Sequence, residues 1–397
     1  MKTFLMKKII VIISSVFSFA LFSQNRSMEF DHGTWNEALA KATKENKPVF
    51  VDAYTTWCGP CKWMTKNVFT NDTVADFYNK NYVCVKMDME KGEGVDLAKQ
   101  WGVKAYPTLL FFDSKGDLIH RACGSMENQK FIQLGKDATD PAKQFKTKKK
   151  LVESGKASNQ AKADYIVAMS KACMDYEEEL KTYFVSQKET DLLSQENWYL
   201  MNWLVKDPYS REFQYLLSNK TAFQKIHTED SVNKKIENVY SGSLYGLSYK
   251  DDDEKFAKMK EEVRKSGIVN SEKIILSADM SFYAHKKDWD NYAKSSVNYI
   301  DKYALNNADV LNNVAWGFYE NVSDKTMIEY ALRWAKKSID IKQDYANTDT
   351  YAALLYKSGN TKDAKTQAEK AIELAKKENT DYKGTQELLD KINTGIK

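Results

Sequence analysis

Two cysteines separated by a glycine and a proline constrain this chain more than any other feature. They lie in the segment Trp57-Cys58-Gly59-Pro60-Cys61, between an apolar run that predicts a strand at 49–54 and a helical pattern. At the start of a helix this spacing brings both sulfurs onto one turn, where free backbone N–H groups and the helix dipole stabilise a thiolate. The segment therefore predicts a redox-active dithiol, with Cys58 as the nucleophile and Cys61 as the resolving thiol.

Two other kinds of site could use a cysteine pair. Zinc needs four ligands, and the sequence holds no second Cys-x-x-Cys and only four scattered histidines, so we expect no metal. A purely structural disulfide is disfavoured by the Gly59-Pro60 pair and by the flanking strand and helix. The odd total of five cysteines argues against a disulfide-stapled scaffold. The other three cysteines, Cys84, Cys123 and Cys173, are expected to be small buried hydrophobic residues. A redox role is the alternative for Cys84 and Cys123.

The first third of the chain alternates helical and strand patterns. Thr34 and Glu37 form a capping-box pattern for a helix ending near Glu45, and the helix after the dithiol is interrupted near Asn71. Ser125 can cap a last helix that ends near residue 134. Further strands are expected at 82–88, 108–112 and 118–122, with a short helix at 95–101. The pattern predicts a small α/β sandwich with a mixed sheet.

Residues 49–62, which include the dithiol, residues 101–108 and the turn at 115–116 together resemble thioredoxin over residues 28–136. This resemblance implies the thioredoxin fold and thiol-disulfide exchange, with Asp52 as the buried carboxylate that helps to deprotonate Cys61. It also implies that Lys86 pairs with this carboxylate. The residues support that role independently, because a carboxylate in an apolar strand is desolvated and its pKa rises towards neutral pH.

The resemblance also implies where a substrate binds. Pro107 matches a cis-proline that faces the dithiol, and Tyr106 and Thr108 flank it where a substrate backbone would pair. Proline lacks an N–H group, so backbone is left open at this point. The other expected substrate contacts surround the nucleophile, and they are Trp57, Gly59 and Pro60. Simple packing is the alternative role for Trp57.

The N-terminus predicts export. Three lysines among residues 2–8 precede an apolar run at 9–22, which is the pattern of a signal peptide at 1–23. An uncleaved anchor is the alternative. Residues 35–39 and the interrupted helix after the dithiol look more like the exported branch of the superfamily, including the periplasmic C-terminal domain of the membrane disulfide interchange protein. We expect a soluble periplasmic protein whose thioredoxin-like domain spans 24–140.

The remainder of the chain has a different character. Five lysines within 141–150 predict a linker, and from 151 to 397 apolar residues recur at helical spacing. Small residues around a turn at Gly359-Asn360 resemble tetratricopeptide (TPR) repeats near 308–378. The expected fold class is an α/β thioredoxin fold followed by an all-α, TPR-like helical-repeat domain. A net charge of only +4, with both signs interspersed, does not favour nucleic acid.

The expected function is reduction of disulfides in exported proteins, with electrons from a membrane or other thiol donor. Gly-Pro between the cysteines resembles reducing thioredoxins, whereas strong oxidants usually carry histidine there. The alternatives are a periplasmic oxidant or isomerase, and a TPR-type protein-binding adaptor with a secondary redox role. The helical domain is expected to bind a peptide or protein partner. Dithiol exchange needs no cofactor, and we expect none.

Overall fold

The computed structural model describes residues 26–395, and the predicted signal peptide at 1–23 lies outside them. Contacts divide the chain into two compact units, Met1–Ser186 and Gln187–Lys397. Of the helices within the described residues, none is both long and apolar enough to cross a membrane.

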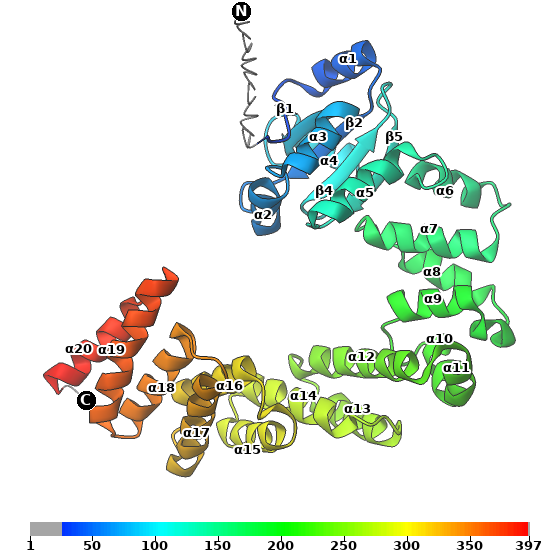
Figure 1. Cartoon of the computed structure of the whole chain (residues 1–397). Helices are drawn as coiled ribbons and strands as arrows, with labels where there is room; N and C mark the ends of the chain where they lie inside the picture. The colour runs from blue at the N-terminus through cyan, green and yellow to red at the C-terminus, as the bar shows by residue number, and fades with distance from the viewer. Residues whose placement is uncertain (1–25, 396–397) are drawn as a thin grey trace, which may run out of the picture. The chain divides into compact units, whose positions relative to one another are not determined.

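The first unit is built on a five-stranded mixed sheet in the order β1-β3-β2-β4-β5 (Figure 1). β2 lies at the centre, parallel to β3 and antiparallel to β4. β5 forms one edge and is antiparallel to β4. The strands are β1 (Phe30–Asp31), β2 (Val49–Tyr54), β3 (Val83–Asp88), β4 (Thr108–Phe112) and β5 (Leu118–Cys123). The predicted mixed sheet is confirmed, and only the two-residue β1 was not expected.

Helices cover both faces of this sheet. They are α1 (Trp35–Glu45), α2 (Gly59–Asn67), α3 (Asp72–Asn81), α4 (Gly94–Gln100) and α5 (Asn128–Thr139). Side chains of α2, α3 and α5 form one core with Phe50 and Phe111, whereas α1 and α4 pack on the opposite face against Val51 and Leu110. Since neighbouring residues of a strand point to opposite faces, Asp52 lies on the same face as Phe50, the face that α2 covers.

Most of the predicted helix starts are confirmed, and one is wrong. Thr34 and Glu37 form the expected capping box of α1, and Asn71 caps α3 with its side chain. Ser125 does not cap the last helix of the sheet domain, because α5 begins at Asn128 and its N-cap Glu127 makes no side-chain capping bond. A serine in a short loop can satisfy the sequence pattern of a cap without lying at the helix start.

Three more helices complete the first unit, α6 (Phe145–Glu153), α7 (Asn159–Lys171) and α8 (Glu177–Val185). α6 occupies most of the lysine-rich range that the sequence predicts to be a linker. Phe145 is buried at its start, and the Phe145 N–H donates to His120 Nδ1 on β5 over 3.1 Å. Lys146 Nζ lies 2.7 Å from Asp117 Oδ2. The lysines therefore line a helix that contacts the sheet edge.

A disulfide joins this helical part to the sheet. Cys123 at the end of β5 pairs with Cys173, which follows α7, and their Cα atoms are 5.8 Å apart. The expectation that both residues are small buried hydrophobes is therefore wrong. The two cysteines are 50 positions apart in the sequence, and no local pattern reveals the pairing. Cys84 is buried and free, as expected.

The second unit is entirely helical within the described residues. Its first half holds η1 (Glu189–Leu193), α9 (Gln195–Leu204), α10 (Arg211–Ser218), α11 (Lys220–His227), α12 (Glu229–Ser248) and α13 (Asp253–Lys265). Its second half holds α14 (Ser271–Lys286), α15 (Trp289–Tyr299), η2 (Ile300–Ala304), α16 (Ala308–Asn321), α17 (Lys325–Ile341), α18 (Tyr345–Lys357), α19 (Thr361–Glu378) and α20 (Lys383–Thr394). The all-helical prediction is confirmed.

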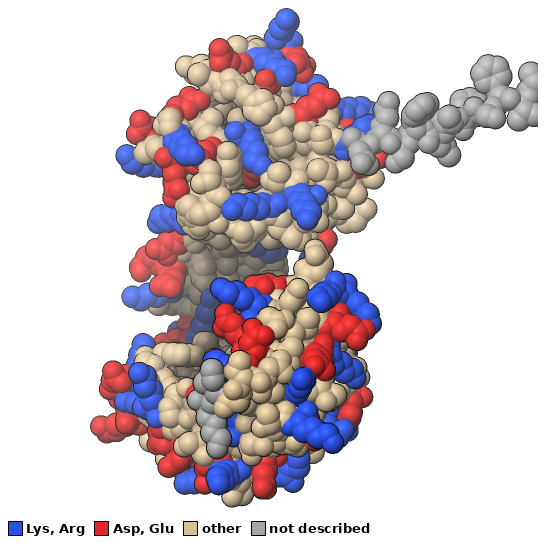
Figure 2. Space-filling view, turned by 90° about the vertical axis from the view of Figure 1, so that its left-hand side faces the viewer, with Lys and Arg blue, Asp and Glu red and all other residues tan. Residues whose placement is uncertain are grey.

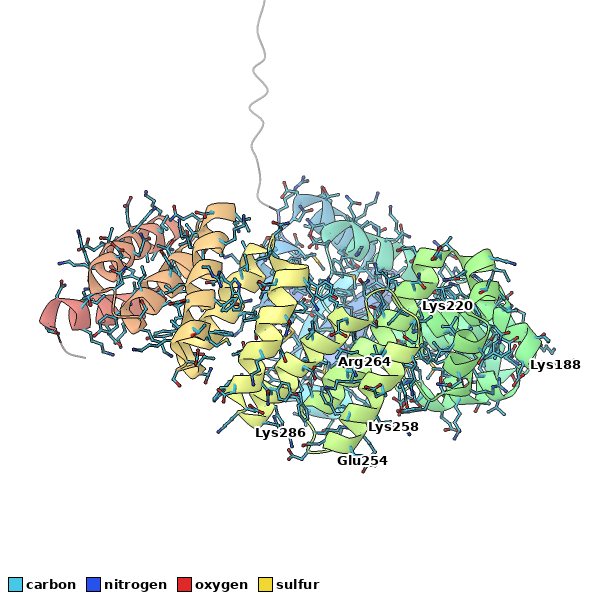
Figure 3. The ribbon with its side chains drawn as sticks, turned by 90° about the horizontal axis from the view of Figure 1, so that it is seen from below. Lys188, Lys220, Glu254, Lys258, Arg264 and Lys286 are labelled. Carbon is cyan, nitrogen blue, oxygen red and sulfur yellow. A yellow bond between two sulfur atoms is a disulfide. The ribbon has the colours of Figure 1, made fainter. Side chains whose placement is uncertain are left out.

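Acidic and basic side chains are mixed on the surface of these helices. In Figure 3, Glu254, Lys258 and Arg264 are spread along α13, and Lys286 lies at the end of α14, where it pairs with Asp253 over 2.9 Å. The face seen in Figure 2 likewise shows Lys and Arg mixed with Asp and Glu. This mixture matches the interspersed charges of the sequence.

The predicted repeat region contains two helical pairs, α16 with α17 and α18 with α19. α18 and α19 are joined by a tight turn in which Gly359 has a φ of +89°, a left-handed conformation that favours glycine. Ala364, Ala368 and Ala371 of α19 are fully buried, so small side chains let these two helices approach closely. The resemblance of these pairs to TPR repeats stays a prediction.

Candidate active site

The two cysteines of the dithiol lie where the central strand passes into α2. They form a disulfide in the structure, with Cα atoms 5.3 Å apart. Cys58 is the N-cap residue of α2, and its Sγ accepts a hydrogen bond from the Cys61 N–H over 3.1 Å. Pro60 lies in the first turn, where its missing N–H group leaves no intrahelical bond unmade. The helix therefore offers both a donor and its dipole to a thiolate on Cys58.

A buried carboxylate lies in the same central strand. Asp52 is 1% exposed, and among the described residues neither of its carboxylate oxygens has a hydrogen-bond partner. Burial raises the pKa of Asp52 to about 6, against the opposing effect of Lys86. The Lys86 Nζ lies 3.7 Å from Asp52 Oδ2, which is close enough for an ion pair and too long for a hydrogen bond. This carboxyl can therefore take up or release a proton near neutral pH.

Lys86 is held by contacts that the sequence did not indicate. Its Nζ donates to Thr65 Oγ1 over 2.5 Å, and it lies 5.0 Å from the centre of the Tyr54 ring. Thr65 is on α2, one turn after Cys61, so the helix that carries the dithiol also positions the lysine. The pairing of Asp52 with Lys86 in the parallel β2–β3 register sets the distance between the two charges.

A cavity of about 350 Å³ connects the lysine with the resolving thiol. It is lined by both Cys61 and Lys86, together with Tyr54, Thr55, Thr56, Lys62, Thr65 and Lys66. The cavity is open to solvent and has room for several water molecules. Water in it contacts Cys61 and Lys86, whereas Asp52 does not line it and is reached only through Lys86.

The segment predicted to bind substrate lies at the same end of the sheet. The Tyr106–Pro107 peptide bond is cis, as the resemblance to thioredoxin implied. In the β2–β4 register Thr108 is opposite Ala53, so Pro107 comes level with the end of β2, from which the dithiol loop starts. The Thr108 hydroxyl donates to the Ala105 carbonyl over 2.7 Å and supports this turn.

Trp57 is not a packing residue. Its side chain is 65% exposed, and its ring lies edge-on to Tyr106 with 5.9 Å between ring centres. Its Nε1 donates to the Glu90 carboxylate over 2.9 Å. Glu90 was not among the predicted site residues, although it follows β3 by two residues, at the edge where the parallel strands β2 and β3 end together. The Trp57 ring is therefore fixed in position, and with Tyr106 it forms an aromatic surface beside the dithiol.

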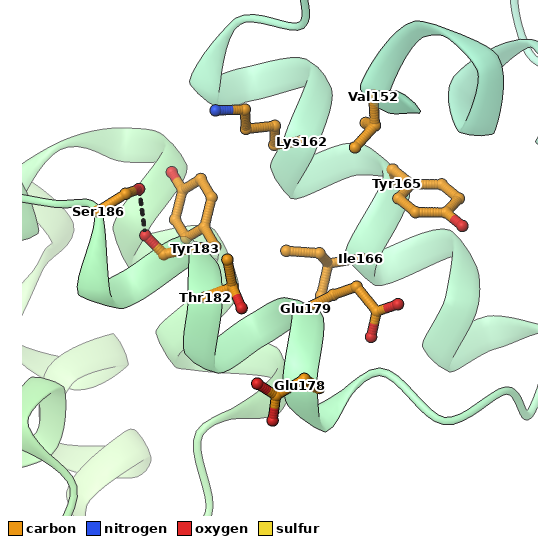
Figure 4. Close-up of a pocket in the computed structure, with 9 residues that line it drawn as sticks. All are labelled: Val152, Lys162, Tyr165, Ile166, Glu178, Glu179, Thr182, Tyr183 and Ser186. Atoms are coloured by element: carbon orange, nitrogen blue, oxygen red, sulfur yellow. Dashed lines mark hydrogen bonds between the residues drawn. The ribbon is translucent and has the colours of Figure 1, made fainter. Parts of the chain in front are cut away.

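A second pocket of the first unit lies away from this chemistry. It has a volume of about 370 Å³ and is formed by α6, α7 and α8, as Figure 4 shows. Its lining residues are Val152, Lys162, Tyr165, Ile166, Glu178, Glu179, Thr182, Tyr183 and Ser186, which include no cysteine. Within residues 26–395 no cluster of three or more His, Cys, Asp or Glu side chains is arranged to hold a metal ion.

Known proteins match the part of the chain that carries the dithiol. The family model described as Thioredoxin-like matches residues 31–114. Thioredoxin H1 of Arabidopsis thaliana is 32% identical over 98 residues, which cover 24% of this chain and 78% of that protein. The thiol:disulfide interchange protein DsbD of Yersinia pestis is 35% identical over 95 residues, which cover 23% of this chain.

The match to DsbD covers only 16% of that protein's length. Among solved structures, the C-terminal domain of Neisseria meningitidis DsbD in its oxidised form is 24% identical. It aligns with a TM-score of 0.25 over 28% of this chain and 99% of that domain. The match to thioredoxin H1 covers more than two thirds of a whole relative. The chain belongs to the thioredoxin-like family, and its first unit is a thioredoxin-like oxidoreductase domain with a Cys58–Cys61 disulfide.

Proposed function

We propose that the protein reduces disulfide bonds of exported proteins by dithiol exchange at Cys58 and Cys61. The observation that carries this proposal is the position of Cys58 at the N-cap of α2, where its sulfur accepts the Cys61 N–H. Such a site favours the thiolate, which is the form that attacks a disulfide. The nearby Asp52–Lys86 pair and the cis Tyr106–Pro107 bond also support the proposal.

In the first step the Cys58 thiolate attacks one sulfur of the substrate disulfide. A Cys58–substrate disulfide forms, the substrate S–S bond breaks, and the leaving sulfur takes up a proton. We assign Trp57, Tyr106 and Thr108 to substrate contact, together with Gly59 and Pro60 of the loop. The exposed Trp57 ring and the open backbone beside Pro107 suit an extended, partly apolar peptide segment.

In the second step Cys61 resolves the mixed disulfide. Its thiol passes a proton to ionised Asp52, and the thiolate attacks Cys58 Sγ. The Cys58–Cys61 disulfide forms, and the substrate leaves with both of its sulfurs reduced. Asp52 suits this role because its pKa of about 6 lets it be ionised, yet basic, near neutral pH. Lys86 keeps that pKa from rising further.

A thiol donor must then reduce the Cys58–Cys61 disulfide, and we propose that it is bound to the membrane. The similarity to DsbD supports this source of electrons, since that protein is named for thiol:disulfide interchange. The signal-peptide pattern at 1–23 supports a periplasmic location. Gly-Pro within the motif supports reduction over oxidation.

A trapping experiment tests the exchange. In a Cys61→Ser variant the second step is blocked, so the Cys58–substrate disulfide should accumulate and be visible on a non-reducing gel. Cys58→Ser should trap nothing, and Cys84→Ser is the matched control because Cys84 is buried and free. Equal trapping by the Cys58→Ser and Cys61→Ser variants would refute the assignment of the nucleophile.

We further propose that the helical second unit binds the protein substrate and raises its concentration near Cys58. Tyr245 on α12 is 58% exposed, Tyr249 just after the helix is 50% exposed, and their rings are 5.0 Å apart. Exposed aromatic side chains of this kind are common in protein interfaces. A tethered substrate would meet the dithiol at a higher effective concentration.

A chain that ends at Ser186 tests this tethering, because the cut leaves the first unit and both disulfides whole. Its rate on a trapped protein substrate should fall, while its rate on a small disulfide such as oxidised glutathione should stay the same. Tyr245→Ser with Tyr249→Ser should act in the same direction, with the exposed Tyr303→Ser as control. Unchanged rates on the protein substrate would reject tethering.

A further inference from the structure

The Cys123–Cys173 disulfide joins the edge strand of the sheet to the end of a helix outside it. Cys123 is the last residue of β5, Cys173 follows α7, and their Cα separation of 5.8 Å lies within the range of disulfide-bonded pairs. Both residues belong to the first unit, so this proximity is internal to one compact body. The dithiol chemistry proposed above uses neither sulfur.

The backbone at Cys173 favours other residues. Its φ is +50°, a left-handed conformation that normally selects glycine or asparagine at a helix end. Asn46 after α1 and Asn379 after α19 follow that preference in the same chain. Cys173 departs from that preference, as Lys287 after α14 does, and it differs from Lys287 in being disulfide-bonded. Cys173 is also exposed and Cys123 is only partly buried, so a thiol can reach the bond.

α7 is linked to the sheet through α6 and through a small contact with β5. Phe145, Tyr165 and Met169 form a small apolar cluster between α6 and α7, and it is separate from both cores of the sheet. α6 contacts the sheet edge through the Phe145 N–H bond to His120 and through Lys146 with Asp117. The disulfide is thus the covalent link that keeps the end of α7 on β5.

The same disulfide adjoins the predicted substrate segment. In the β4–β5 register Cys123 is opposite Thr108, and the Gly124 N–H donates to the Pro107 carbonyl over 2.8 Å. A change at Cys123 therefore acts one residue away from a backbone bond to the cis-proline. The redox state of this pair can influence the surface where a substrate lies.

We propose that Cys123–Cys173 is a second redox site, reduced by exchange with a dithiol protein, and that its reduction releases α7 from β5. A donor thiolate attacks the exposed Cys173 sulfur, the Cys123–Cys173 bond breaks, and Cys123 leaves and takes up a proton. The second donor thiol loses its proton and attacks the mixed disulfide, which closes the donor disulfide and frees Cys173 as a thiol. Two electrons and two protons pass from the donor to the pair.

The test uses the full chain with Cys58→Ser, Cys61→Ser and Cys84→Ser, so that Cys123 and Cys173 are the remaining thiols. Dithiothreitol is added without denaturant, and thiols are counted by differential alkylation and mass spectrometry. The pair should be oxidised at the start and fully reduced by the dithiol. Hydrogen exchange of residues 159–171 should then become faster, while exchange of residues 49–54 stays the same.

The same alkylation is applied to the wild-type chain. If Cys123 and Cys173 are oxidised there as well, the result in the variant does not come from a folding defect. A matched variant with Cys123→Ser and Cys173→Ser should show fast exchange in α7 with or without dithiol. The proposal is overturned if the two thiols are free in the air-oxidised protein, or if the bond survives until denaturant is added. It is also overturned if reduction leaves the exchange of α7 unchanged.

Discussion

Replacing Asp52 by asparagine should make the sheet domain more stable at pH 8 and leave it nearly unchanged at pH 4. The carboxyl has a pKa of about 6 in the folded chain against 3.8 ordinarily, because burial opposes its charge. Between these two values the folded chain binds more protons than the unfolded chain, so its stability falls as pH rises. At about 1.4 kcal/mol for each pH unit, the ionised carboxylate costs the fold about 3 kcal/mol above pH 6.

Hydrogen exchange of the strand amides can measure this difference. Exchange of peptides covering β2 and β4, corrected for intrinsic rates, gives the free energy of opening at each pH. We expect Asp52→Asn to exceed the wild type by up to about 3 kcal/mol at pH 8, with the gap closing as pH falls from 6 to 4. Asp96→Asn is the matched control, since the Asp96 side chain is 90% exposed.

Parallel curves for Asp52→Asn and the wild type between pH 4 and pH 8 would refute this reasoning. A larger stability difference between Asp52→Asn and the wild type at pH 4 than at pH 8 would mean that the pKa of Asp52 is lowered by folding, not raised. In either case Asp52 could not be the proton acceptor proposed for Cys61, because its ionisation would not be opposed by burial.

Three further predictions follow from single contacts. Cys58→Ser should reduce the rate of disulfide reduction to background. Cys61→Ser should still form the mixed disulfide with the substrate, as measured by the release of one substrate thiol per chain. Lys86→Met should raise the pKa of Asp52 above 6, because the nearby positive charge is lost. The pH at which the rate of the resolving step is half-maximal should then shift upward. Lys66→Met, which removes a charge from the same cavity, should leave that pH unchanged. Burial lowers the pKa of His120 from 6.5 to about 4, so stability at the start of α6 should fall as pH drops from 6.5 to 4. Hydrogen exchange of residues 145–153 should show this loss, and His120→Gln should remove the pH dependence.

The sequence predicted the parts of the fold that rest on local patterns. The apolar run of β2 and the capping box at Thr34 each lie within a few residues, and both are confirmed. Asp52 stood out because a carboxylate is unusual in such a strand. Its burial and its pairing with Lys86 follow from the register of two parallel strands.

Other features depend on contacts between distant segments. The Cys123–Cys173 bond, the Glu90 partner of Trp57 and the Thr65 partner of Lys86 each join different elements. No periodicity or motif links these residues, so they appear only when the sheet order is known. β1 was missed because two residues are too short for a strand pattern.

The reduction potential of the Cys58–Cys61 pair tests the central claim most directly. Full-length protein would be equilibrated with glutathione buffers of known potential, and the two cysteines quantified separately from Cys123 and Cys173 by alkylation and mass spectrometry. A reductase fed by a thiol donor predicts a value near that of thioredoxin, about −270 mV. A value near about −120 mV, typical of a strong oxidant, would contradict the proposed direction of electron flow.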